Sequence, residues 1–80
     1  MEILSTAQMA SVLKTAYLVD NPPIIVVQDW EYTVTPAALE KPDWLTELPL
    51  LAEIVIPAND SVYMRTEHGW VNFLDHEEVE

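Results

Sequence analysis

Carboxylates are the only chemically active side chains that this sequence holds in number. Of its 80 residues 14 are Asp or Glu and 3 are Lys or Arg, which gives a formal net charge of -11. Paired carboxylates can do acid–base chemistry. In a chain with 14 carboxylates, however, any chosen pair is weak evidence for a catalytic site. Ser61, His68 and Asp60 could be drawn as a catalytic triad, yet the nucleophile elbow of a hydrolase is missing around Ser61. We therefore predict no catalytic residues and no enzyme activity.

Metal and cofactor motifs are also missing from the sequence. The chain has no Cys and a single Gly, which excludes a thiolate zinc site and the glycine-rich loops that bind phosphates. His68 and His76 lack the helical spacing of a zinc protease site. Asp75, His76 and Glu78 could be drawn as a metal site, but acidic tails of this kind are usually only solvated. We predict no metal and no cofactor.

The spacing of two carboxylates indicates another use of the charge. On an extended strand Asp29 and Glu31 would point the same way about 6.7 Å apart, comparable with successive phosphates along a nucleic-acid strand. Carboxylates from other segments would widen this pair into an acidic face that binds a partner. The predicted residues are Asp29, Glu31, Glu40, Asp43, Glu47, Asp60, Glu67, Asp75, Glu77 and Glu78. The alternative is that these carboxylates surround the domain and keep it soluble.

Such a charge favours a basic protein as the partner, because it repels nucleic acids and acidic membranes. Trp30, Trp44 and Trp70 would stack on bases only beside a basic groove, which this chain lacks. We expect these residues in or beside the core, with Trp44 and Trp70 as candidate apolar anchors. The predicted partner is the nucleic-acid-binding cleft of a host complex, and the predicted oligomeric state is a monomer or weak dimer.

The first element that must position these groups is a helix. Ser5 and Gln8 have the spacing of a capping box, and Asn21, Pro22 and Pro23 end the helix. Its inner face is apolar and its outer face carries only Lys14 as a charge. The predicted inner face consists of Met9, Val12, Leu13, Ala16 and Tyr17.

Strands follow this helix. Residues 24–35 alternate as one long strand, with Val26, Trp30, Tyr32 and Val34 on its core face. A Pro-rich, partly helical loop covers residues 36–49. Three strands of a meander then occupy residues 52–56, 61–66 and 70–74, and the turn before the last strand gives Gly69 a positive φ.

These elements predict an α+β fold: one N-terminal helix packed on a small antiparallel sheet of about four strands, with the Pro-rich loop. We expect one domain over residues 1–80, with 75–80 as a frayed acidic tail. No signal peptide or membrane span is recognised, and the expected location is the cytoplasm of a host cell.

Size, acidity, the absence of Cys and this layout resemble the small proteins with which phages inhibit host defence. Anti-CRISPR proteins and uracil-DNA glycosylase inhibitors are the nearest types, in composition and layout over the whole chain rather than in any residue string. The resemblance implies an acidic, DNA-mimicking inhibitor that blocks a nucleic-acid-binding complex such as a CRISPR surveillance complex.

A second, narrower resemblance concerns the hairpin in the last part of the chain. Residues 54–56 and 62–71 resemble a hairpin pattern found in small phage and actinobacterial proteins. The resemblance implies a phage origin more than a function. The alternative hypothesis for the function is a phage assembly protein or an antitoxin-like module, whose contact surface would be apolar and include Leu18, Trp44 or Trp70. Strong salt dependence of binding would favour the inhibitor, and its absence would favour the apolar module.

Overall fold

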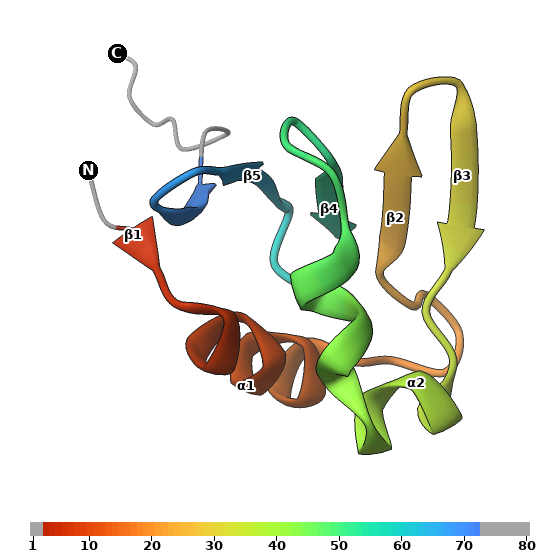
Figure 1. Cartoon of the computed structure of the whole chain (residues 1–80). Helices are drawn as coiled ribbons and strands as arrows, with labels where there is room; N and C mark the ends of the chain where they lie inside the picture. Colours follow the sequence, from red (N-terminus) through yellow and green to blue (C-terminus); the bar gives the residue numbers. More distant parts are fainter. Residues whose placement is uncertain (1–2, 73–80) are drawn as a thin grey trace, which may run out of the picture.

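The computed structural model describes residues 3–72, and in these residues helices cover one side of an antiparallel sheet (Figure 1). The elements are β1 (Ile3–Leu4), α1 (Thr6–Ala16), β2 (Ile24–Val27), β3 (Trp30–Thr33), α2 (Pro36–Glu40), the 3-10 helix η1 (Pro42–Glu47), β4 (Glu53–Ile56), β5 (Ser61–Thr66) and β6 (Gly69–Asn72). The six strands lie in the order β1-β6-β5-β4-β2-β3. The α+β class is confirmed, whereas the expected number of about four strands is wrong.

Helix α1 begins as predicted. The amide of Gln8 donates to Ser5 Oγ at 3.2 Å and the amide of Ser5 donates to Gln8 Oε1 at 2.8 Å, which together form the capping box. Met9 and Leu13 are buried on its inner face. The helix ends at Ala16, earlier than the two prolines require, and Tyr17 is already extended. None of the helices in the described residues is long and apolar enough to cross a membrane.

Two features raise the number of strands from four to six. The segment predicted as one strand is a hairpin, because Gln28, with a φ of 55°, and Asp29 form a two-residue turn between β2 and β3. The other addition is β1, whose two residues pair with Val71 and Trp70 of β6. The hairpin also changes the faces of the strands, since Trp30 now lies opposite Val27 rather than on the face of Val26.

The core lies between the helices and the sheet. Its buried members are Leu4, Met9, Leu13, Ile25, Val34, Leu45, Ile54, Ile56 and Trp70. Of the residues predicted to face the core from the long strand, only Val34 is buried. Trp30 is 66% exposed and Tyr32 is 53% exposed, so their assignment to the core is wrong.

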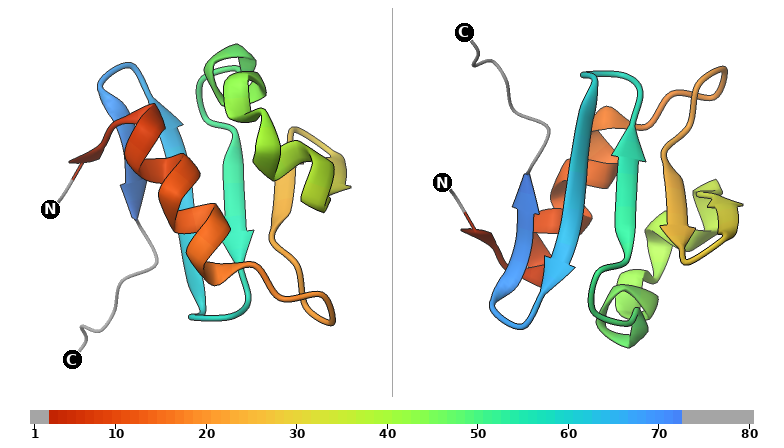
Figure 2. Two further views of the ribbon diagram at one scale, coloured as in Figure 1. Left: turned by 90° about the horizontal axis from the view of Figure 1, so that it is seen from below. Right: turned by 90° about the horizontal axis from the view of Figure 1, so that it is seen from above.

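Segment 36–47 packs against this core through α2 and η1. Leu45 is fully buried, and the indole nitrogen of Trp44 donates to the carbonyl of Ala38 at 2.9 Å. Arg65 of β5 donates to the carbonyl of Leu45 at 2.7 Å, which ties η1 to the sheet. The helices of residues 3–72 therefore all lie on the same side of the strands (Figure 2).

Candidate protein-binding surface

One face of the sheet is not covered by any described helix, and we call it the open face (Figure 2). Directly paired residues of antiparallel strands point to the same side of a sheet, so the register identifies its members. They are Ile3, Ile24, Val26, Glu31, Thr33, Glu53, Val55, Val62, Met64, Thr66 and Val71. Along a strand of an antiparallel sheet, apolar residues usually point to the core and the residues between them, which face water, are polar. The open face is instead mostly apolar. Val71 is buried, and the other apolar side chains of this face are at least partly exposed. An apolar sheet face that no described helix covers is typical of a protein-binding site.

A single carboxylate lies within the apolar part of the open face. Glu53 pairs with Met64 on one side and with Val26 on the other, and it is half-buried. Sequence analysis did not select Glu53. The signal that could have identified it is the alternation in this strand, which places Glu53 and Val55 on the face opposite Ala52, Ile54 and Ile56. A half-buried carboxylate among apolar neighbours is suited to accept a Lys or Arg side chain from a partner.

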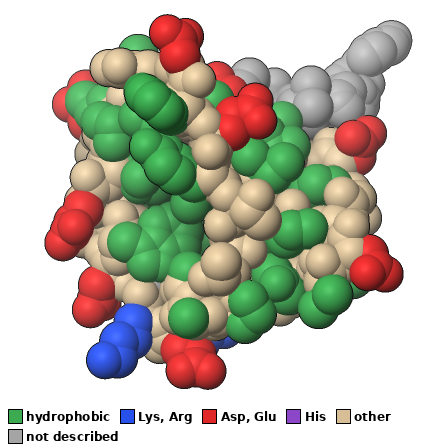
Figure 3. All heavy atoms as spheres, turned by 90° about the vertical axis from the view of Figure 1, so that its right-hand side faces the viewer, with side chains coloured by type: hydrophobic (Ala, Val, Ile, Leu, Met, Phe, Trp, Pro, Cys, Tyr) green, Lys and Arg blue, Asp and Glu red, His purple; other side chains and the backbone are tan. Residues whose placement is uncertain are grey.

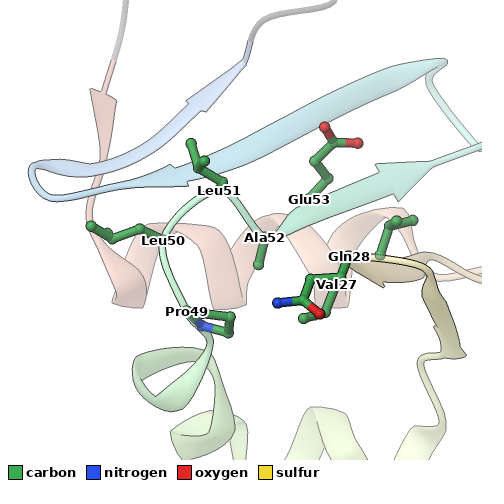
Figure 4. Close-up of a pocket in the computed structure, with 8 residues that line it drawn as sticks. Val27, Gln28, Pro49, Leu50, Leu51, Ala52 and Glu53 are labelled. Carbon is green, nitrogen blue, oxygen red and sulfur yellow. The ribbon is translucent and has the colours of Figure 1, made fainter.

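A groove of about 470 Å³ lies between the end of β2 and the turn that leads into β4 (Figure 4). The lining residues are Val26, Val27, Gln28, Pro49, Leu50, Leu51, Ala52 and Glu53. Leu51 and Glu53 point to one side of the chain and Ala52 to the other (Figure 4). The groove and the open face thus share Val26 and Glu53.

The turn beside this groove has a strained backbone. The amide of Ala52 donates to the carbonyl of Pro49 at 3.2 Å, and Leu51 within this turn has a φ of 73°. Leu51 and Ala52 both bond to Arg65, through the Leu51 amide at 2.9 Å and the Ala52 carbonyl at 2.8 Å, which is a β-bulge. A left-handed conformation disfavours Leu by about 1–2 kcal/mol. Strain of this kind is often found at functional sites.

Replacing Leu51 by Gly is expected to raise the free energy of unfolding by about 0.5–1 kcal/mol, because Gly removes the left-handed strain at a modest entropic cost. Little burial is lost, since Leu51 is 70% exposed. Leu50→Gly is the matched control, because Leu50 is also exposed but has no positive φ, and it should lower stability slightly. Urea denaturation followed by circular dichroism compares the two. A Leu51→Gly chain less stable than the wild type would contradict the strain.

The predicted acidic residues are all exposed where the structure describes them, but they are not brought onto one face. Asp29 lies in the β2–β3 turn, so the predicted same-strand geometry of Asp29 and Glu31 is wrong. Asp60 and Glu67 flank opposite ends of β5, about 20 Å apart. Glu40, Asp43 and Glu47 lie on α2 and η1, on the helix side. Asp75, Glu77, Glu78 and the rest of the tail lie outside the described residues.

Trp70 and Trp44 lie in or beside the core as predicted, whereas Trp30 does not. Trp70 is fully buried, with the Arg65 guanidinium 5.9 Å from its ring centre, so it cannot be a surface anchor. Trp44 is half-buried and its indole nitrogen is bonded within the chain, which makes it a packing residue. Trp30 is the exposed tryptophan, on β3 beside Tyr32.

The residues drawn above as a triad are not brought together. Ser61 begins β5, whereas His68 lies in the turn after its end, so the hydroxyl and the imidazole are at opposite ends of this strand. Within residues 3–72 no three His, Asp or Glu side chains are placed to hold a metal ion.

Comparison with protein-family models, with curated proteins and with solved structures finds no match to this chain.

Proposed function

We propose that this chain is a non-enzymatic binding protein that docks its open face on a protein partner. The partner would present an apolar patch that contains a Lys or Arg able to reach Glu53. The observation that carries the proposal is a sheet face that no described helix covers, in a chain with a net charge of -11. Around Glu53 this face has six apolar side chains that are at least partly exposed, together with the buried Val71.

Affinity and specificity would come from different parts of this surface. Burial of the apolar side chains contributes about 25 cal/mol per Å² of area removed from water. Desolvation of Glu53 is unfavourable unless a cation meets it, so this residue would discriminate against partners without one. The exposed carboxylates around the domain would raise the association rate with a basic partner.

Glu53→Lys is expected to lower partner affinity at least about a hundredfold, because the change places like charges opposite each other within the interface. Glu47→Lys is the matched control, since it makes the same change in net charge at an exposed site on η1. Both variants would be immobilised with the wild type and exposed to a bacterial lysate. A protein retained by the wild type and by Glu47→Lys, but not by Glu53→Lys, supports the proposal. Equal retention by all three chains would contradict it.

We propose in addition that the partner is a nucleic-acid-binding host-defence complex, such as a CRISPR surveillance complex, whose function the chain inhibits. Clefts that hold nucleic acid are common large positive surfaces, and the net charge of -11 favours them. The chain should displace DNA from such a partner in a gel-shift assay, with inhibition weakened at high salt. A partner that holds DNA and the chain together would contradict inhibition by blocking.

The open face also supports the assembly or antitoxin-like module, because an apolar contact requires no basic cleft. The two functions differ in their dependence on salt. Affinity that is unchanged between low and high salt would favour the module, and Glu53→Gln would then have little effect.

A further inference from the structure

We infer that the free edge of β3 is a second docking site, which pairs with an extended basic segment of a protein partner. By the free edge we mean the backbone groups of β3 that point away from β2. This site uses the backbone groups of Glu31 and Thr33, whose side chains lie at the margin of the open face. It does not need the apolar residues around Glu53 and does not rest on the function proposed above.

Strand β3 is the last strand of the sheet on its side, at the right-hand margin of Figure 1. The amide of Val34 donates to the carbonyl of Pro23 at 2.9 Å. In an antiparallel pair, bonded and non-bonded positions alternate, so Tyr32 and Trp30 also direct their backbone groups toward β2. Glu31 and Thr33 therefore direct their N–H and C=O groups outward. These groups can pair with one more strand.

Strand β3 is short and carries the charge of Glu31, but it lacks the other usual protections of an edge strand. Its four residues include no Pro and no Lys, and all four are exposed. Trp30 and Tyr32 lie next to each other on one face and expose more than half of each side chain. Figure 3 views this side of the molecule, where hydrophobic side chains fill much of the surface and carboxylates lie mostly around its margin. A segment that paired here would bury the aromatic pair and gain backbone hydrogen bonds.

The carboxylates near β3 and the alternation of side chains along a strand together indicate which side chains the partner segment should have. Asp29 precedes the strand and Glu31 is part of it, so a side chain opposite Glu31 would gain from being Lys or Arg. The neighbouring side chains of the added strand would lie beside Trp30 and Tyr32 and would be apolar. The edge of a second copy fits poorly, because it would bring another chain of net charge -11 to the same carboxylates.

The test uses a blocked peptide that alternates lysine and valine, titrated into the full chain and followed by NMR. We expect the amides of Glu31 and Thr33 to shift. Thr33→Pro removes an outward N–H that β2 does not use, so the sheet should stay folded while peptide affinity falls about tenfold or more. Thr33→Val keeps the N–H and should bind like the wild type. Circular dichroism and urea denaturation would verify that each variant is folded.

Three further binding measurements test the role of charge at this edge and its independence from the open face. Glu31→Lys should weaken binding of the lysine–valine peptide, and a glutamate–valine peptide should bind the wild type more weakly than the lysine–valine peptide. Glu53→Lys should keep peptide binding at the edge, so failure of the open-face proposal would leave this one standing. Binding by Thr33→Pro that equals the wild type would overturn the inference. So would the absence of wild-type binding at about 1 mM peptide, or a dimer that Thr33→Pro dissociates.

Discussion

Replacing Trp70 by alanine is expected to leave most of the chain unfolded at 25 °C. Trp70 is fully buried in the core against Leu4 and the helices, and truncation of a buried Trp costs about 3–5 kcal/mol. An 80-residue domain has a free energy of unfolding of about 4–12 kcal/mol, and self-repulsion at a net charge of -11 places this chain toward the lower end. The loss is therefore comparable with the whole stability.

The same chain supplies graded controls for this measurement. Trp44 is half-buried, so Trp44→Ala should cost less than Trp70→Ala, and Trp30→Ala should change stability by no more than about 0.5 kcal/mol because Trp30 is mostly exposed. Urea denaturation followed by far-ultraviolet circular dichroism gives all three values. If Trp30→Ala were as destabilising as Trp70→Ala, the described β2–β3 hairpin would be wrong.

The elements with strong local signals were predictable from the sequence. The capping box of Ser5 and Gln8 starts α1, and the turns around Asp60 and Gly69 separate the strands of the meander. Gly69 has the predicted positive φ, at 136°. In each case one or two residues determine a local conformation, and no information about distant parts of the chain is needed.

The β2–β3 hairpin was not predictable in the same way. Its turn is Gln28-Asp29, without the Asn-Gly or Asp-Gly pair that normally indicates a two-residue turn. Alternation through residues 24–35 then looks like a single strand. This error placed Trp30 and Tyr32 in the core and Asp29 beside Glu31. Strand β1 was missed because two residues show no periodicity.

The open face also could not be predicted, for a different reason. Ile54 and Val55 are both β-branched and apolar, yet Ile54 is fully buried whereas Val55 is on the uncovered side. A strand that is apolar on both faces does not indicate which of them a helix covers. The distinction arises only when α1, α2 and η1 all pack on the same side of the sheet.

The open face combines carboxylates and apolar side chains on the same surface. Glu31 and Glu53 belong to the same row of paired residues as Val26, Met64 and Val71. A partner that covers the row must meet both carboxylates while it buries their neighbours. Binding by this face should therefore depend on salt and on apolar truncation together, unlike either of the two hypotheses drawn from the sequence alone.

Replacing Gly69 by alanine is expected to lower the free energy of unfolding by about 3 kcal/mol. A φ of 136° strains any L-residue, and a Cβ at this position would overlap the carbonyl oxygen of Leu4 and lie 2.9 Å from Ile3 Cγ2. The Leu4 oxygen belongs to the backbone, so the overlap is relieved only if β1 moves away from β6. Ile3 would then leave the row of the open face.

This displacement predicts two linked losses in Gly69→Ala. The urea midpoint should fall below that of the wild type. Exchange of the Leu4 amide with solvent should accelerate, relative to the wild type, more than exchange of the β4 amides, because the disruption begins at the β1–β6 pair. His68→Ala is the matched control in the same turn, since its exposed side chain can be removed at a cost of no more than about 0.5 kcal/mol. Wild-type stability with faster exchange would mean that β1 adds little to the fold. Wild-type values for both would contradict the close approach of Gly69 to Leu4, and with it the placement of Ile3 on the open face.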